Sequence, residues 1–386
     1  MKKTIINFHE VSKYAETLLS GKIHAKRIES IANGALGIIH AVDLSIHGIG
    51  HGLAAAKGLV DKHAIKQVDR YLSNDGINIW EFFWQWIPYQ LGTRSDAFLA
   101  FDWTEYASDD QATVTLYLIS SHGRATPLLW MSVVKSTMAG QRNGYEDELL
   151  IFLRLVLNKT STVINITILA DRGFGDQKLY ALLDNMKFNY IIRFRQGILV
   201  ESAAGESKAA QDWLLANGKA RLLRGAKVTS KRYQVGAVVC VHAKGMKDPW
   251  CLVASYNNVS AAMIVQLYGL RFTIEESFRD IKDDRYGMGL KSTHIGDPAR
   301  RDRLLIIAAI ATVLLTLLGA AGESLGMDRM LKANTTKKRT HSLFRQGCLY
   351  YNKLPNMNPD LRSALKKKFA QLIKESAIAS LIFGFI

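Results

Sequence analysis

The sequence AFLAFDW at Ala97–Trp103 is followed by ATVTLYLIS at Ala112–Ser120 and by PLLWMSVV at Pro127–Val134. These segments are rich in β-branched and aromatic residues, which favour strands. The turn-forming pair His122-Gly123 separates the second segment from the third. The pattern therefore predicts three consecutive strands, which would begin a sheet.

Helices and strands alternate after these segments. The sequence predicts a helix at 146–157, a strand at 163–170, a helix at 178–186 and a strand at 190–195. Three strands followed by such alternation are typical of an α/β core with a mixed sheet. We interpret the more polar residues of about 197–249 as a β-rich insertion into this core.

Composition and charge indicate a folded protein with a polyanionic partner. The chain has 386 residues, 48% apolar and 22% charged, which excludes a mostly disordered chain. Fifty Lys and Arg against 34 Asp and Glu give a net charge of +16, which suits nucleic acid first and an anionic membrane second. Three cysteines without a CxxC pair, and an N-terminus without a signal-peptide pattern, predict a reduced, cytoplasmic protein.

Both ends of the chain are predicted to be helical and basic. Residues 1–95 would form an N-terminal DNA-binding region, in which His63, Lys66 and Arg70 share one polar helix face. A charged face is more often merely solvated, so both interpretations stay open. The central α/β domain would span 96–325, and a basic C-terminal region at 326–386 would serve dimerisation or regulation.

One apolar segment allows two interpretations. Residues Leu304 to Gly322 contain no charged side chain and are about as long as the shortest membrane-spanning helix. A helix buried on all sides in a large domain has the same composition. Taken alone the segment does not decide between them.

Two aspartates stand in or after apolar strands. Asp102 interrupts AFLAFDW, and Asp171 follows the apolar run that ends at Ala170. A carboxylate at the carboxyl end of a buried strand faces the crevice in which α/β sheets bind ligands. The alternative is a loop cap or an ion pair with a nearby arginine such as Arg172.

A third acid lies on the helix predicted at about 261–282. With 100° per residue, a set of polar side chains falls within about 80° of arc on one face. The set comprises Tyr268, Arg271, Glu275, Arg279 and Lys282. Clustered carboxylates can hold divalent cations, and flanking arginine and lysine can bind phosphates. A solvated helix laced with salt bridges would show the same pattern.

The spacing on this helix is similar to a known signature. Tyr-x2-Arg-x3-Glu-x6-Lys is the signature of the insertion-sequence-four family of bacterial DDE transposases, and it is occupied here by Tyr268, Arg271, Glu275 and Lys282. At roughly 5% per required residue, a chain of this length matches by chance in about two cases in a thousand.

Other segments also resemble this family. They are Asp102-Trp103, Asp171 to Phe174, Ile274 to Lys282 and Tyr286 to Leu290, and the resemblance spans about residues 60–345. It implies a ribonuclease-H-like catalytic core with a β insertion between the second aspartate and the glutamate. Relatives also have an apolar segment packed in the core after this helix, which favours burial of 304–322 over membrane insertion.

The resemblance implies a role for each matching residue. Asp102, Asp171 and Glu275 would be the catalytic acids and would hold two Mg²⁺ ions, for which Mn²⁺ would substitute. Phosphates near the cut end would be bound by Tyr268, Arg271 and Lys282, with Arg279 as a further cation on the same helix. Trp250 matches a tryptophan that stacks on a flipped base, and Arg193 matches a basic residue that grips a DNA hairpin. Both could instead be ordinary strand residues.

The implied activity is cut-and-paste transposition by strand nicking, hairpin formation, hairpin opening and transfer into target DNA. The partners would be double-stranded DNA, as terminal inverted repeats and as target, and a second copy of the chain in a synaptic homodimer. A bacterial, nucleoid-associated cytoplasmic protein that does not enter the membrane is expected. The alternatives are a catalytically silent, transposase-derived DNA-binding protein, and another nuclease or resolvase on the same fold.

Overall fold

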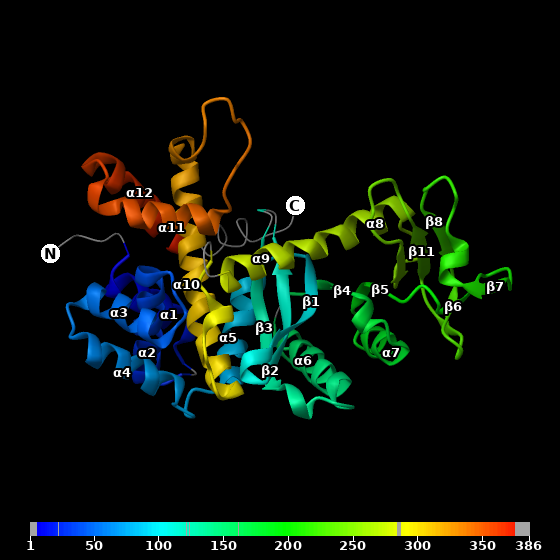
Figure 1. Ribbon diagram of the computed structural model, residues 1–386, viewed down its shortest axis with the longest axis horizontal. Coiled ribbons are helices and arrows are strands. Elements are labelled where there is room, and N and C mark those ends of the chain that lie inside the picture. Colours follow the sequence, from blue (N-terminus) through cyan, green and yellow to red (C-terminus); the bar gives the residue numbers. More distant parts are fainter. Residues whose placement is uncertain are drawn as a thin grey trace.

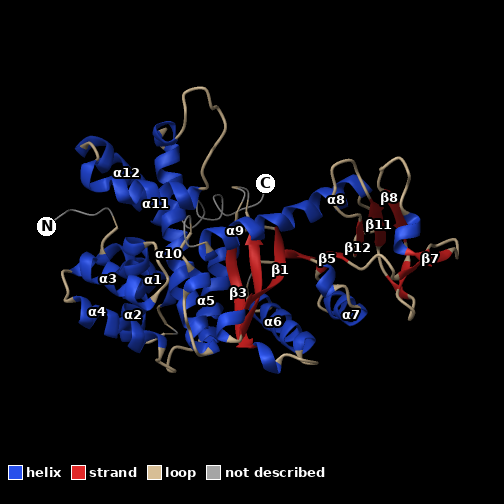
Figure 2. Cartoon of the chain, viewed as in Figure 1, coloured by secondary structure: helices blue, strands red, loops and turns tan. Residues whose placement is uncertain are grey.

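The computed structural model describes residues 6–21, 23–120, 122, 124–160, 162–283 and 287–374 (Figure 1). Tyr286, part of one segment that resembles the transposase family, lies outside these residues, as do the ends of the two terminal regions. Helices gather at both ends of the sequence, and the strands lie between them (Figure 2).

Five helices precede the first strand. They are α1 (Phe8–Leu19), α2 (Ala25–Ala41), α3 (Ile46–Lys57), α4 (Asp61–Leu72) and α5 (Ile79–Leu91). The helices α3 and α4 are separated at Gly58, which caps α3 at a φ of 67°. Glycine adopts this left-handed conformation without steric cost, so the chain turns there and α4 begins anew.

A mixed sheet forms the centre of the molecule. Its first five strands are β1 (Asp96–Tyr106), β2 (Gln111–Ile119), β3 (Ala125–Val134), β4 (Asn165–Ala170) and β5 (Asn189–Arg193). Their spatial order is β3-β2-β1-β4-β5, in which β1, β2 and β3 are antiparallel neighbours and β4 and β5 run parallel to β1. The helices α6 (Arg142–Leu157) and α7 (Gln177–Asn185) connect the parallel strands. The α/β core with a mixed sheet is therefore confirmed.

Three further strands extend the sheet beyond β5. They are β12 (Trp250–Ala254), β11 (Ala237–Val241) and β8 (Arg221–Arg224), in that order and all antiparallel to their neighbours. A separate four-stranded sheet contains β6 (Leu199–Glu201), β7 (Ser207–Ala209), β9 (Lys227–Val228) and β10 (Tyr233–Gln234). The region of about 197–249 is thus rich in strands, as its sequence predicts.

The two faces of the main sheet contact different helices. Apolar side chains of α6 and α7 join one buried cluster with one face of the sheet. The other face packs against α8 (Ala261–Gly269) and α9 (Thr273–Lys282), which a 3₁₀ turn at Leu270–Phe272 connects. Figure 1 shows α8 and α9 as one nearly continuous rod that runs from the inserted strands across the sheet. The rod carries the third acid over the ends of the central strands.

The apolar segment forms a core helix. It lies within α10 (Pro298–Ser324), which runs between the N-terminal helices and the edge strand β3 (Figure 1). Among the described residues α10 is the one helix long and apolar enough to cross a membrane, but 89% of its most apolar window is buried inside the protein. This burial favours the core interpretation. The helices α11 (Leu343–Lys353) and α12 (Pro359–Lys374) pack against α10.

Candidate active site

Asp102 and Asp171 lie on neighbouring parallel strands. Phe101 of β1 pairs in register with Ala170 of β4, so the two aspartates are the next residues along the adjacent strands. The Asp102 side chain accepts a hydrogen bond from the backbone N–H of Trp103 (2.9 Å). The Asp171 side chain accepts one from the N–H of Gly173 (2.8 Å), which caps a 3₁₀ turn. The parallel pairing of β1 and β4 thus brings the two carboxylates close together, although Asp102 lies inside β1 and not at its carboxyl end.

The electrostatic environment of Asp102 disfavours an isolated negative charge. Its side chain is 20% exposed. Burial raises the pKa of Asp102, the guanidinium of Arg271 lowers it, and the nearby negative charge of Asp171 raises it again. The net shift is upward. Two neighbouring carboxylates in a partly buried site need a cation close by.

Arg271 provides a cation in this structure. Its Nη1 lies 3.3 Å from Asp102 Oδ2, and its Nη2 lies 3.3 Å from Glu275 Oε1. The Arg271 side chain is 9% exposed, whereas that of Glu275 is 54% exposed. One guanidinium thus links the acid on β1 to the acid on α9, which are distant in sequence.

The other two signature residues also lie near Asp102. Lys282 ends α9 and donates a hydrogen bond from Nζ to Thr104 Oγ1 (3.1 Å), two residues beyond Asp102 on β1. Its positive charge helps to lower the pKa of Asp102. Tyr268 is buried, which raises its pKa, while the charges of Arg271 and Arg193 lower it. The signature spacing therefore corresponds to one spatial cluster.

The expected single polar helix face is not present in the structure. Tyr268 and Arg271 are both buried. Arg271 lies in the 3₁₀ turn, so a regular advance of 100° per residue does not hold from Tyr268 to Lys282. Arg279 is exposed and pairs with Glu276 at 3.2 Å on another flank of α9. The structure therefore does not bring Arg279 to the carboxylates.

Trp250 and Arg193 lie beside the Tyr268 end of the site. The Trp250 ring, at the start of β12, is edge-on to Tyr268 with ring centroids 5.0 Å apart. Its face is stacked on Phe272, with centroids 5.7 Å apart and the planes 25° from parallel. Arg193 ends β5 and donates a hydrogen bond to the carbonyl of Pro249 (3.1 Å). Phe272 was not predicted from the sequence, although it follows Arg271 directly.

Two more arginines line the cleft and were also missed. The cleft is lined by Asp102, Trp103, Glu105, Arg142, Asp171, Arg172, Gly173 and Arg195. Arg142 lies over the Trp103 ring (5.2 Å) and pairs with Glu146 (3.2 Å), which in turn accepts a hydrogen bond from Trp103 Nε1 (2.7 Å). Arg142 begins α6, far in sequence from Asp102, Asp171 and Glu275, so no spacing relative to those acids points to it. Arg195 could have been found because it is two residues beyond Arg193.

Together these features define a mixed α/β protein in which Asp102, within β1, and Asp171, just after β4, form an acidic site with cations around it. Residues 139–314 match the family model for the transposase DDE domain. The match begins after Asp102 and includes Asp171 and Glu275. No curated protein matches this chain. The match supports a DDE transposase, a class that binds DNA and generally uses divalent metal ions.

Proposed function

We propose that this protein is a metal-dependent DDE transposase of the insertion-sequence-four family that moves DNA by a cut-and-paste, hairpin-forming route. One observation carries the proposal. Asp102 and Asp171 end up side by side on β1 and β4, and Arg271 joins Asp102 to Glu275 on a helix more than a hundred residues later. Arg271 thus contacts acids from two separate segments, and the third acid lies on the strand next to one of them.

A ribonuclease-H-like core is part of this proposal. The order β3-β2-β1-β4-β5, with three antiparallel strands followed by two parallel ones, supports it. The core would span 96–325 with a β insertion at about 197–249. The helices of residues 1–95 would contact DNA, and the region 326–386 would serve dimerisation or regulation.

The three acids fit divalent metal ions such as Mg²⁺, with Mn²⁺ as a substitute. Their donors are all carboxylate oxygens, which these hard cations prefer. Among the described residues, no group of three or more His, Cys, Asp or Glu side chains is placed to hold a metal ion in this structure. Asp102, Asp171 and Glu275 would hold the ions in the proposed function. When bound, such ions lower the pKa of a water nucleophile and stabilise the leaving 3′ oxygen.

The residues around the acids would hold DNA. Lys282 and Arg271 supply positive charge for phosphates beside the scissile bond, and Tyr268 would add a hydrogen bond. Arg271 would then exchange a carboxylate partner for a phosphate. Trp250 would stack on a flipped base. For the base to reach the ring face that Phe272 now covers, Phe272 would have to move. Arg193 would contact the hairpin. A DNA-binding role for Arg279 has less support, because Arg279 pairs with Glu276 on another flank of α9.

The reaction would proceed by four in-line displacements at phosphorus. Water first cleaves a P–O3′ bond at the transposon end. The freed 3′-OH then attacks the opposite strand and closes a hairpin, a second water opens it, and the 3′-OH finally attacks target DNA. In each step one P–O bond forms as another breaks, and the protein's part is to position groups and stabilise charge.

The partners would be terminal inverted repeats, target DNA and a second copy of the chain in a synaptic dimer. We place the protein in the bacterial cytoplasm, associated with the nucleoid. The buried state of α10 supports a protein that does not enter the membrane. The net charge of +16 supports binding to DNA.

Replacement of single acids tests this proposal. Asp102→Asn, Asp171→Asn and Glu275→Gln should each slow nicking of the element's own ends at least about a hundredfold, because each removes a carboxylate charge at the reacting phosphate. End binding, measured by gel shift, should stay within a few-fold of wild type. An acid variant that still cleaves would remove that residue from the catalytic set.

The alternative is a catalytically silent, transposase-derived DNA-binding protein. It predicts that wild type binds the ends without cutting them, with or without divalent metal. A nuclease or resolvase on the same fold would cut but never join the cut end to target DNA. A strand-transfer assay with labelled ends separates these three outcomes.

A further inference from the structure

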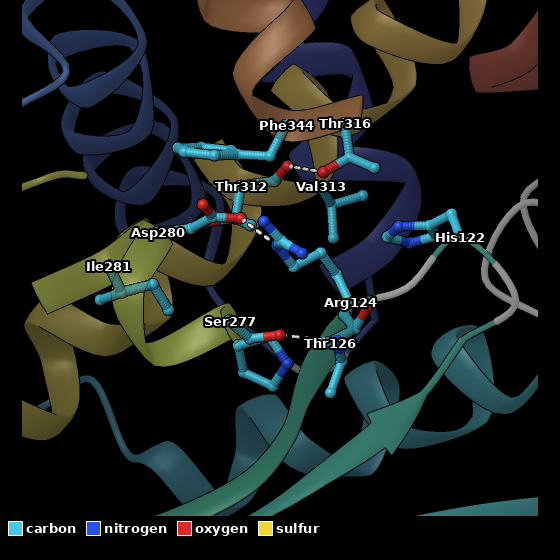
Figure 3. Close-up of a pocket in the computed structure, with 12 residues that line it drawn as sticks. His122, Arg124, Thr126, Ser277, Asp280, Ile281, Thr312, Val313, Thr316 and Phe344 are labelled. Carbon is cyan, nitrogen blue, oxygen red and sulfur yellow. Dashed lines mark hydrogen bonds and ion pairs between the residues drawn. The ribbon is translucent and has the colours of Figure 1, made fainter. Parts of the chain in front are cut away.

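The helix that carries Glu275 has a second polar flank. Ser277 and Asp280 of α9, with Glu276 beside them, face the first residues of β3 rather than the acid cleft. Figure 3 shows the two residues opposite Arg124, where α9 meets the edge of the sheet, α10 and α11. This flank has no part in the chemistry derived above.

Arg124 makes the closest contact across this junction. Its Nε lies 2.8 Å from Asp280 Oδ2, and its Nη2 lies 3.8 Å from Glu276 Oε2. The next residue, Ala125, donates its backbone N–H to Ser277 Oγ (2.6 Å). Ser342, which caps α11, contributes a longer hydrogen bond to Asp280 (3.4 Å). Arg124 and Ala125, at the beginning of β3, thus hold three side chains on one flank of α9: Glu276, Ser277 and Asp280.

These contacts are shielded enough to matter. The side chains of Arg124 and Asp280 are 24% and 16% exposed. Arginine paired with a carboxylate in such surroundings forms a directional, charge-assisted hydrogen bond. A pair at this depth resists screening by salt more than the exposed ion pairs on the surface do.

The helix needs external support to hold Glu275 in place. With ten residues, α9 is shorter than the length at which isolated helices become stable in water. A 3₁₀ turn precedes it and weakens its continuity with α8. Glu275 itself is half-exposed, and Arg271 links it to Asp102. A small rotation of α9 about its axis would therefore carry the Glu275 carboxylate away from Asp102.

We propose that Arg124 is a positioning residue that, through Asp280 and Glu276, fixes the rotation of α9 and so the distance between the Glu275 and Asp102 carboxylates. This inference rests on the proposed function, in which both acids would take part in holding divalent ions. Arg124 touches neither DNA nor the reacting atoms in this role. It acts on the site through the helix.

A metal-binding measurement on the full chain tests this role directly. Tb³⁺ prefers oxygen donors, and its luminescence can be excited through Trp103, whose backbone neighbours Asp102 and which lines the cleft. The variants are Arg124→Gln, which removes the charge, Arg124→Lys, which keeps it, and Asp280→Asn. Arg339→Gln is the matched control, because it removes a partly buried ion pair to Glu323 on α10 at the same junction without touching α9.

Arg124→Gln should raise the half-saturating Tb³⁺ concentration about five- to tenfold and slow nicking by a similar or larger factor, with end binding unchanged. Arg124→Lys should recover most of the loss. Arg124→Gln combined with Asp280→Asn should be no worse than either single change, because both remove the same pair. Arg339→Gln should stay within about twofold of wild type.

If Arg124→Gln binds Tb³⁺ and nicks DNA as well as wild type does, the positioning role is wrong. So would an Arg339→Gln defect as large as that of Arg124→Gln, since it would show general loosening of the junction. If circular dichroism shows that Arg124→Gln does not fold, Asp280→Asn takes its place. Wild-type Tb³⁺ affinity and a wild-type nicking rate in Asp280→Asn would then overturn the role, and Arg124→Lys should still be close to wild type. A Tb³⁺ signal that Asp102→Asn leaves unchanged would instead overturn the proposed function.

Discussion

Arg271 joins two carboxylates that belong to different parts of the fold. Its Nη atoms each lie 3.3 Å from an acid, Asp102 on one side and Glu275 on the other. Because the side chain is buried, this cation offsets like charges that would otherwise repel each other. A phosphate or a metal ion that enters the site would compete for the same partners. Lys282, by contrast, donates a hydrogen bond to the hydroxyl of Thr104 on β1.

Lys282 permits a clean test of phosphate binding. Lys282→Ala removes one cation that the proposed function assigns to a phosphate, while the Arg271 link between the acids remains. We expect weaker end binding and a slope of log affinity against log salt that is shallower by about one unit. Fluorescence anisotropy at several salt concentrations measures this slope, and an unchanged slope would count against the assigned role.

A second residue-scale prediction concerns His122, beside Arg124. Burial, with the positive charges of Arg339 and Arg124, lowers the pKa of His122 to about 4, although the negative charge of Glu323 opposes this shift. The unfolded chain therefore binds a proton below about pH 6.5 that the folded chain does not. The stability contributed by neutral His122 is complete above that pH and is lost as the pH falls toward 4.

His122→Gln should remove this acid sensitivity. Between pH 7 and pH 4 the unfolding free energy of wild type should fall by about 3 kcal/mol more than that of the variant. The reason is that the pKa of His122 is about 4 in the folded chain and about 6.5 in the unfolded chain. Urea unfolding at several pH values measures the difference. Parallel curves for the two proteins would show that His122 is not kept neutral by the fold.

At the scale of elements, the packing of α10 on α11 depends on two glycines. A Cβ at Gly347 of α11 would collide with the carbonyl of Leu315, and one at Gly319 of α10 would collide with that of Leu343. At these two positions the backbones of the helices are therefore too close together for any residue with a Cβ. This crossing fixes the junction at which Arg124 meets α9.

Gly347→Ala should destabilise the protein by about 3 kcal/mol or more, because neither backbone can yield without disturbing the core. Gly144→Ala is the control, since a Cβ there has open space around it in helix α6. That change should be neutral or stabilising by up to about 1 kcal/mol. Thermal melts report both effects, and equal melting temperatures for the two variants would contradict the close helix contact.

Sequence periodicity predicted most elements because their local signals agree with the fold. The strands around Asp102 and before Asp171 are apolar and β-branched, and they pair in parallel after two antiparallel strands and a helix. The burial of Tyr268 and Arg271 could not be predicted in this way, since a regular 100° advance assumes an unbroken helix. Likewise, Arg142 reaches the cleft through tertiary folding alone, and no spacing reports it.

At the scale of the whole molecule, α10 connects the parts. Its first turns carry buried charges that tie it to neighbours, as Arg301 pairs with Asp109 and Arg303 lies against the carbonyl of Leu72. Tyr71 of α4 donates a hydrogen bond to the carbonyl of Arg303 (2.8 Å). The N-terminal helices and the acid-bearing sheet therefore share one core helix. DNA held by the former would be fixed in position relative to the latter.

The most direct test of the central claim is excision of a marker flanked by the element's own ends, measured for wild type and Glu275→Gln with Mg²⁺ and then with a chelator. We predict metal-dependent excision by wild type and none by Glu275→Gln, although both proteins bind the ends. Binding of the ends by both proteins with excision by neither would contradict a catalytic role and favour a DNA-binding protein.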